Sequence, residues 1–476
     1  MEELPEDGIH ESEKEIWSQL PDLKGEERAQ ALDTLGFHAF ERKEFASAGV
    51  LAEESAVELE KLNRIPDAIN ALVNSCFSWF MYDDVVESTR TGLEAIRVIR
   101  LHGAERVNPR VLVKLGKCLS FHEKKKDAIE IYNLAVSAFI ENGELHDAGH
   151  AMSETASLLE ESNEIYESLR MYEIALETIK GESVKNCCLE LVLKLMKLYM
   201  LVEDFVSAAE LGKNAQSLRY MQEGLVECFI RLDILNASLA NEMGQFRKAH
   251  DLAGKVIEKI AKSGDSKYAA ECAIELARSN FGMNEMQSGL RTIYKAVRIA
   301  DMNGQVDNLK KAIYVGERGI RDEAKLKEFI EFVSSRKSIK DEPELDDFVS
   351  LRLIDRLIST NQREEATKRL DSALKRGISE DRLLDFYVLR AKLAWRLNNS
   401  EVLNILLSKV EEIASNKNLE TEQKIAKLIR TNLEEHPAKA GPLLDMFNYR
   451  TDEKSRSSKL IIELTMLSTS LSNQAS

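Results

Sequence analysis

A regular series of small residues constrains the fold of this chain more than any other feature. Seven residues, each Ala, Ser or Gly, recur at intervals of 40 or 41 positions: Ala48, Ser88, Ala128, Ser168, Ala208, Ala249 and Gly289. Because these three residue types make up roughly a fifth of an ordinary sequence, the chance of such a series is about 10⁻³ even after the choice of phase is allowed for. Seven positions later, the same intervals give Ser55, Ala95, Ala135, Ala175, Ala215, Val256 and Ala296. The chain is therefore built from internal repeats.

One repeat unit is plainest in the stretch 112–135. Leu115 and Gly116 lie within one apolar helical pattern, a polar turn follows, and Ala128 and Tyr132 share one face of a second helical pattern. Two helices approach closely only where their side chains are small, so Ala, Gly or Ser is expected where the helices cross. The sequence predicts an all-α protein, a solenoid of αα-hairpins.

The composition agrees with a helical repeat protein and argues against two kinds of partner. Charged residues make up 31% and hydrophobic residues 44% of the 476 residues, with only 7 Pro and 22 Gly, which is typical of long helices. The formal net charge of −16 argues against general affinity for nucleic acid or anionic membrane, because phosphate binding needs a basic surface. No apolar run approaches the about 18 residues that a membrane span requires. We therefore expect neither nucleic acid nor membrane as a partner.

The cysteines indicate a reducing compartment. Six of them lie within the helical patterns: Cys76, Cys118, Cys187, Cys188, Cys228 and Cys272. None forms a C-x-x-C pair or has a histidine at the spacing of a zinc site. The N-terminal sequence is acidic, whereas a secretion signal begins with basic and then apolar residues. These features predict reduced core thiols in a cytoplasmic protein.

The strength of the repeat changes along the chain and divides it into five predicted segments. The first contains Trp17, which is expected to cover the open face of the first repeat. The segments are an acidic N-terminal stretch with a short capping helix (1–25), seven repeats (26–304), a degenerate repeat and break (305–345), two further hairpins with a capping helix (346–450), and a Ser-rich tail (451–476). The tail holds an apolar patch at 460–471, which either docks on the repeats as a helix or binds a partner.

Several residues of the hairpin match a known repeat pattern. They are the pairs Leu35-Gly36 and Leu115-Gly116 and the aromatic residues Tyr132 and Tyr199. These positions resemble the tetratricopeptide repeat, in which W-x-x-L-G-x-x-Y is followed by Ala, Phe, Ala and Pro. The resemblance implies a right-handed superhelix. The period here exceeds that of the ordinary tetratricopeptide repeat, so the helices must be longer, and arrays of this long-helix type resemble vesicle-fusion adaptors, polarity adaptors and bacterial peptide receptors.

The resemblance also implies a concave groove lined by the first helix of each pair. Transferred onto this sequence, the groove positions form a predicted partner-binding surface. It comprises Phe37, Phe40, Asn70, Phe77, Phe80, Arg110, Lys117, Ser120, His150, Glu160, Lys197, Arg231, Asn241 and Arg278. Four cations of this set, Arg110, Lys117, Arg231 and Arg278, are expected to fix the register of a partner through its acidic groups.

Aromatic residues crowd the first two repeats of this surface. Phenylalanine rings that face solvent are costly unless something covers them, so Phe37, Phe77 and Phe80 predict a hydrophobic partner segment. The alternative is that the longer helices bury these rings against the neighbouring repeat. Replacing Phe77 and Phe80 by alanine separates the two readings. Loss of partner binding with unchanged melting indicates a groove, whereas unfolding indicates a core.

Few residues suggest catalysis. His146 and His150 lie four apart with Asp147 beside the first, which is the spacing of H-E-x-x-H zinc proteases. The acid is one carbon shorter and no third ligand stands out, so a solvated helix start is favoured, with Asp147 stabilising the helix N-terminus. The nucleotide-binding and nucleophile motifs are absent. We expect neither enzymatic activity nor a metal or cofactor.

The sequence therefore favours a non-enzymatic scaffold or adaptor that binds a peptide or helical segment of a partner in the groove. Two alternatives remain. One is a regulatory repeat protein that responds to a small peptide, and the other is an assembly protein that self-associates through its repeats.

Overall fold

The computed structural model of the chain describes residues 11–179, 186–217, 226–263, 266–417, 419–435 and 444. Within these ranges the regular elements are all helices and no strand occurs, so the predicted all-α fold is confirmed. The chain divides into two compact units, Met1–Leu195 and Met196–Ser476, and the division falls inside one helix. The acidic residues 1–10 and the predicted tail with its apolar patch lie outside the described residues. The boundaries of the five predicted segments stay a prediction.

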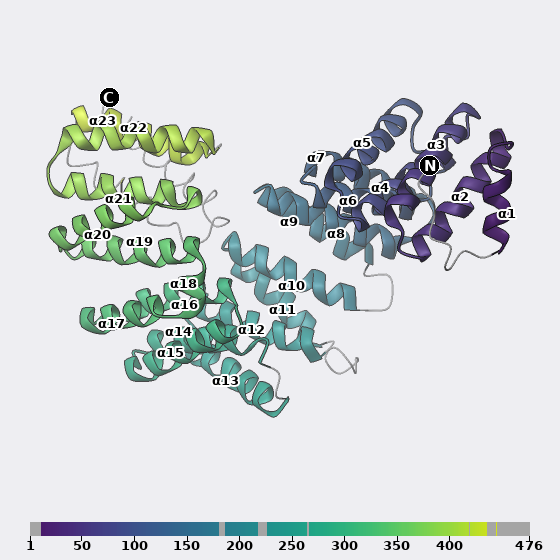
Figure 1. Cartoon of the computed structure of the whole chain (residues 1–476). Coiled ribbons are helices and arrows are strands. Elements are labelled where there is room, and N and C mark those ends of the chain that lie inside the picture. The colour runs from purple at the N-terminus through teal and green to yellow at the C-terminus, as the bar shows by residue number, and fades with distance from the viewer. Residues whose placement is uncertain are drawn as a thin grey trace, which may run out of the picture. The chain divides into compact units, whose positions relative to one another are not determined.

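The helices follow one another as antiparallel pairs (Figure 1). Unit 1 and the helix at the division comprise α1 Glu11–Gln19, α2 Gly25–Glu41, α3 Phe45–Lys61, α4 Ile65–Met81, α5 Val85–His102, α6 Pro109–Phe121, α7 Lys125–Glu141, α8 Leu145–Glu161, α9 Ile165–Ile179 and α10 Asn186–Leu201. The elements that follow in unit 2 are α11 Phe205–Ser217, α12 Val226–Glu242, α13 Phe246–Ser263, α14 Ala269–Gly282, α15 Met286–Met302, α16 Val306–Gly319, α17 Glu323–Ser334, α18 Lys337–Asp341, α19 Pro343–Ser359, α20 Arg363–Arg376, the 3₁₀ turn Glu380–Arg382, α21 Leu383–Arg396, α22 Ser400–Asn416 and α23 Glu420–Glu435.

A left-handed residue follows the helices at a constant interval. These residues have φ between +58° and +83° and are Lys43, Asn63, Asp83, Gly103, Glu123, Gly143, Asn163, Glu203, Gly244, Asn284 and Gly304. Most neighbours in this series are 20 positions apart. Where the series omits a turn, its neighbours are 40 or 41 positions apart. In a typical turn the next N–H closes the helix end, as Lys124 N does on Leu119 O at 2.9 Å, the hydrogen bond of a Schellman motif. Turns within and between hairpins are thus alike, apart from the longer connection 103–108 between α5 and α6.

The predicted small residues lie where the helices touch. All seven members of the first series are buried. The hydroxyls of Ser88 and Ser168 donate to the carbonyl oxygens of Cys76 and Ala156 in the preceding helix, at 2.9 and 2.7 Å. Such contacts to the backbone require the helices to be close, which a larger side chain at these positions would prevent. The small-residue series therefore sets the distance between the helices of a hairpin.

Each unit has its own core. In unit 1, Trp17 of α1 packs against a cluster that contains Leu32 and Leu35 of α2, and the core continues through the buried Tyr132 and Phe139 of α7. Four cysteines, Cys76, Cys118, Cys228 and Cys272, are buried free thiols. The side chains of the other two lie outside the described residues.

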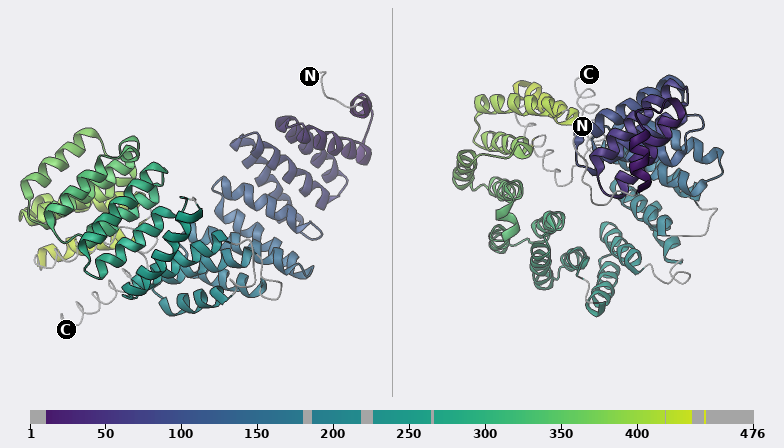
Figure 2. Two further views of the ribbon diagram at one scale, coloured as in Figure 1. Left: turned by 90° about the horizontal axis from the view of Figure 1, so that it is seen from below. Right: turned by 45° about the vertical axis from the view of Figure 1, so that its right-hand side comes forward.

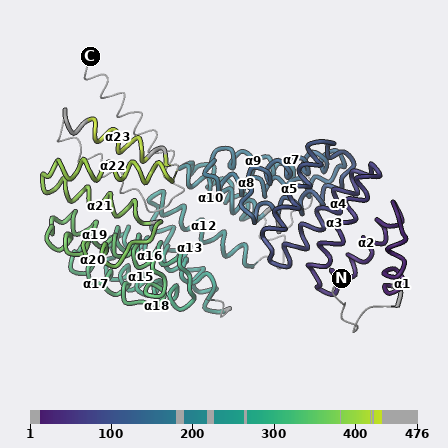
Figure 3. Tube along the Cα trace, turned by 45° about the horizontal axis from the view of Figure 1, so that its top comes forward, coloured from purple at the N-terminus to yellow at the C-terminus, as the bar shows by residue number. Residues whose placement is uncertain are grey.

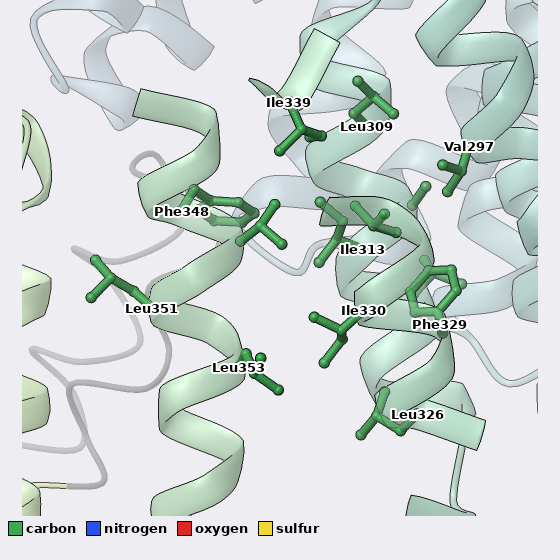
Figure 4. Close-up of a cluster of buried hydrophobic side chains, with 14 of the residues drawn as sticks. Val297, Leu309, Ile313, Leu326, Phe329, Ile330, Ile339, Phe348, Leu351 and Leu353 are labelled. Carbon is green, nitrogen blue, oxygen red and sulfur yellow. The ribbon is translucent and has the colours of Figure 1, made fainter. Parts of the chain in front are cut away.

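In unit 2 the main core lies between α14 and α21. Figure 4 shows Ile313 of α16, Ile330 of α17 and Phe348 of α19 directed toward one another in this core. The short α18 adds Ile339, which is fully buried. The later helices of the unit follow in chain order from teal to yellow in the right-hand view of Figure 2 and in the trace of Figure 3. The degenerate part of the repeat therefore still supplies apolar side chains to the stack.

The turn geometry predicts opposite effects for two matched substitutions. Glu123→Gly should stabilise unit 1 by about 1 kcal/mol, because a side chain at positive φ is strained and glycine is not. Gly143→Ala should destabilise it by a similar amount, although a Cβ there would meet no atom within 4 Å. Urea unfolding of the full chain, followed by circular dichroism, measures both. Equal effects of the two changes would show that the turns do not hold the left-handed conformation.

Candidate protein-binding surface

Four phenylalanine rings from α2, α4 and α6, those of Phe40, Phe77, Phe80 and Phe121, contact one another in unit 1, and Phe37 precedes them on α2. We call Phe37, Phe40, Phe77, Phe80 and Phe121 the aromatic row. Ring centroids are 5.8 Å apart between Phe40 and Phe77, 6.0 Å between Phe77 and Phe80, and 4.9 Å between Phe80 and Phe121. Phe37 lies one helical turn before Phe40 on α2. Contacts at these distances each contribute about 0.5–1.5 kcal/mol beyond burial of area, so the row has a defined shape before any partner arrives.

The members of the aromatic row differ in exposure. Phe37 and Phe121, at its ends, are 62% and 63% exposed. Phe40, Phe77 and Phe80 are half-buried, and the last two pack against the core of unit 1. The two interpretations, an exposed groove and a buried core, thus each describe part of the aromatic row. The centre of the row belongs to the edge of the core, and the ends of the row face solvent. Exposed rings that continue a buried apolar surface are typical of an interaction site.

A lysine on α6 covers one side of the aromatic row. The Lys114 ammonium lies 4.2 Å from the centroid of the Phe77 ring and donates to Asn74 Oδ1 at 3.1 Å. Burial lowers the pKa of Lys114, since the charged form is the one that loses hydration. Lys117 is exposed one turn further along the same helix. Basic groups therefore border an apolar surface.

The other predicted groove residues of unit 1 lie on α4, α6 and α8 and differ in exposure. Asn70, Lys117 and His150 are exposed, and Ser120 and Glu160 are half-buried. Another predicted cation, Arg110, is already engaged. It is 69% exposed, and its guanidinium pairs with Glu144, the N-cap residue of α8, and with Asp147 of α8 at 3.0 and 2.8 Å, so a partner would compete with these acids for it.

The remaining predicted groove residues belong to unit 2. Lys197 is exposed and Arg231 is half-buried, while Arg278 pairs with Glu242 at 2.7 Å. Asn241 is only 3% exposed, and its amide donates to the backbone oxygen and to the carboxylate of Glu275 at 3.0 and 2.9 Å. Asn241 holds two neighbouring helices together, so we leave it out of the proposed surface.

Sequence reasoning missed two residues of the surface. Phe121 lies one position beyond the last predicted groove residue of its helix, Ser120. A helical stripe includes position i+4 as well as i+3, so the pattern itself could have found it. Lys114 lies on the adjacent stripe, and only the contact with the Phe77 ring identifies it.

The histidine pair lies in the first turns of α8. The His146 and His150 rings are 4.8 Å apart, and His146 Nδ1 lies 3.7 Å from Asp147 Oδ1. Burial, followed by the nearby His146, lowers the pKa of His150. Among the described residues, no group of three or more His, Cys, Asp or Glu is arranged to hold a metal ion.

Half-buried carboxylates connect helices of unit 2. Glu275 of α14 accepts from Asn241 of α12, and Glu317 of α16 pairs with Arg352 of α19 at 2.8 Å. Burial raises the pKa of both carboxyl groups above their ordinary value, because a low-dielectric surrounding disfavours the charged form. These contacts fix neighbouring repeats relative to each other within the unit.

Comparison with known proteins agrees with this architecture. The family model described as soluble NSF attachment protein, SNAP, matches residues 108–231, about a quarter of the chain. The second helices α3, α5, α7, α9 and α11 begin at Phe45, Val85, Lys125, Ile165 and Phe205, in register with the small-residue series. This repeat of αα-hairpins is similar to that of the tetratricopeptide repeat. No curated protein matches the sequence.

Solved structures that resemble the chain do so at low identity. Yeast Tom70 is 14% identical with a TM-score of 0.43, and the match covers 94% of this chain and 96% of that one. A tetratricopeptide repeat protein from Parabacteroides merdae is 15% identical with a TM-score of 0.38, covering 56% and 98%. Aspartyl phosphate phosphatase F from Bacillus subtilis is 11% identical with a TM-score of 0.42, covering 72% and 93%. At these scores the likeness says nothing about partner or activity.

One further finding concerns membranes. Over the described ranges, no helix combines the length and the apolar character that a bilayer span requires.

Replacing the centre of the aromatic row should destabilise unit 1. Phe77→Ala with Phe80→Ala removes rings that pack on the core, and we expect a loss of about 3 kcal/mol or more. The matched control is Phe37→Ala with Phe121→Ala, which should change stability by about 0.5 kcal/mol or less because these rings are mostly exposed. Thermal and urea unfolding of the wild type and the two double variants measure these changes in stability. Equal losses for both pairs would contradict the division of the row into centre and ends.

Glu275→Gln should stabilise unit 2 at pH 7. Burial raises the folded-state pKa above the ordinary 4.5, so the stability that the neutral carboxyl provides is fully present below about pH 4.5 and is lost as the pH rises through the folded-state value. Glutamine keeps an acceptor for Asn241 without the charge. The difference between variant and wild type in urea unfolding should therefore grow as the pH rises from the ordinary pKa of a glutamate toward neutrality. Exposed Glu258, changed to Gln, is the control. A pH-independent difference for Glu275→Gln would contradict the assignment.

Proposed function

We propose that this chain is a non-enzymatic interaction scaffold that binds a segment of a partner protein along the first-helix face of unit 1. The aromatic row is the observation that carries the proposal. Its ends, Phe37 and Phe121, expose most of their surface, and its centre is held in place by the core. Partner side chains that cover Phe37 and Phe121 would remove apolar surface from water at little cost in ordering, because the rings between them are already fixed.

The chemistry of the partner follows from the groups beside the row. Lys114 and Lys117 lie on α6 next to the phenylalanines, and Lys114 is partly desolvated. A partner segment that places acidic groups beside apolar side chains complements both features, and charge of this kind sets orientation more than affinity. We infer an amphipathic segment, helical or extended, with acidic residues flanking its apolar anchors.

The proposal keeps the predicted class of partner and the predicted compartment. A protein or peptide is favoured over nucleic acid or a membrane because the net charge of −16 opposes general binding to phosphate. The cytoplasmic location rests on the cysteines, of which the described four are unpaired thiols.

Differential capture tests the proposal. A photo-crosslinking amino acid at position 121 should trap a protein from the native host, and Phe37→Ser in that background should reduce the yield at least about fivefold, since each lost anchor weakens binding by about 1 kcal/mol or more. The trapped peptide should be apolar with acidic neighbours. The control carries the crosslinker at position 86, where Val86 is 74% exposed on α5.

Two outcomes would overturn the proposal. Equal products from positions 121 and 86 would show that the aromatic row has no preferred partner. Trapping of a second copy of this chain, with dimers in sedimentation, would replace the adaptor by the self-associating assembly protein.

A further inference from the structure

The repeat allows two second helices to be compared position by position. The small residues Ser88 of α5 and Gly289 of α15 occupy the same place in the repeat. Counting from them, Arg90 corresponds to Arg291 and Arg97 corresponds to Arg298. The two helices therefore carry the same pair of arginines, at the same spacing. Their surroundings differ.

On α5 both arginines are neutralised by carboxylates. Arg90 forms a two-pronged pair with Glu53 of α3, at 2.8 and 2.7 Å, and also pairs with Glu87 at 2.7 Å. Arg97 pairs with Glu94 at 2.7 Å and with Glu60 of α3 at 3.3 Å. Each arginine thus has one acid from its own helix and one from the preceding second helix.

On α15 every one of these acids is replaced. The positions of Glu53 and Glu60 are taken by Gly254 and Ala261 of α13, and those of Glu87 and Glu94 by Ser288 and Lys295 of α15. In the described part of the chain, Arg291, Lys295 and Arg298 form no ion pair with a carboxylate. Compared with α5, helix α15 has the same two arginines, lacks their carboxylate partners and carries Lys295 as a third cation.

The same three cations line a cavity of about 360 Å³ on α15. Its other lining residues are Gln287, Leu290 and Tyr294. The Tyr294 ring is held by Phe332 and Phe329 of α17, at centroid distances of 4.6 and 5.6 Å, and the Arg298 guanidinium lies 5.6 Å from the centroid of Phe332.

One acid of α17 lies near this cavity. Glu328 of α17 is close enough to add to the effect of burial in raising the pKa of Tyr294. On the α13 side, a Cβ built on Gly254 would meet no atom within 4 Å, so the place of the missing Glu53 equivalent is open space.

We propose that this face of α15 binds an acidic segment of another protein, whose carboxylates take the places that Glu53 and Glu60 fill beside α5. Arg291 and Arg298 are seven positions apart, which is about 10.5 Å along a helix, so the segment presents two carboxylates at a matching distance. Carboxylate is favoured because an equivalent arginine, Arg90, already binds a carboxylate two-pronged, the geometry that guanidinium groups recognise best. This surface lies on a second helix of unit 2 and is separate from the aromatic row.

A defined peptide tests the site. The probe is a fluorescent, Ala- and Gln-rich helical peptide with two glutamates seven positions apart, compared with the same peptide carrying glutamine at both positions. Anisotropy at low salt should show binding of the glutamate peptide only, and the affinity should fall as NaCl is added. Arg291→Gln with Arg298→Gln should lower the affinity at least about tenfold. Arg90→Gln with Arg97→Gln is the matched control and should leave it unchanged, because those arginines are already paired.

A second variant tests the same site without removing the arginines. Gly254→Glu with Ala261→Glu returns the missing acids from within the chain and should abolish peptide binding while circular dichroism stays that of the wild type. Adding the same charge to α7, by Asn133→Glu with Ser137→Glu, should not abolish it. The inference is overturned if both arginine pairs contribute equally, if the Gly254 and Ala261 variant still binds, or if polyphosphate or phosphatidylserine vesicles bind this site in preference to the glutamate peptide.

Discussion

The ending of successive helices at a constant interval is the constraint on which the rest of the structure depends. A typical helix here has 17 residues and is followed by a short turn, and a residue at positive φ closes most turns. Because the turns within and between hairpins are alike, a given position recurs on the next second helix after two half-repeats. This regularity brings Arg90 onto Glu53, 37 positions earlier, and it aligns the phenylalanines of α2, α4 and α6 into one row. Long-range contacts thus follow from local turn geometry.

The sequence predicts the hairpins well because their signal is local and repeated. Small residues at the crossings and apolar residues at helical spacing are visible in any one repeat. The shorter 20-residue repeat, one helix with its turn, is harder to recognise in the sequence. Its turns place Lys43, Glu123 and Glu203 at positive φ, a conformation for which these residue types are unusual. Their conformation is imposed by the helices on either side.

The candidate surface was harder to predict, for a physical reason. Periodicity identifies the side of a helix but not whether that side meets solvent or the next repeat. Phe77 and Lys117 occupy the same place in the repeat on α4 and α6, yet one packs on the core and the other is exposed. Asn241 also belongs to the predicted groove, and it is buried because Glu275 on a neighbouring helix accepts its amide hydrogens. Such differences depend on residues of the adjacent repeat, which only an aligned repeat or a structure brings together.

The net charge of a repeat protein does not describe the charge at any one part of its surface. The value of −16 describes the whole chain, but the field at any surface depends on which groups are already paired. An exposed ion pair contributes only about 0–1 kcal/mol, so a repeat can lose the carboxylates that neutralise two arginines at little cost to folding. Stability in a solenoid is close to a sum of local terms, which confines that cost to one interface. The arginines of α15 then keep the guanidinium geometry that selects carboxylate but have no carboxylate partner in the described part of the chain. An acidic group of another protein can form the ion pair instead.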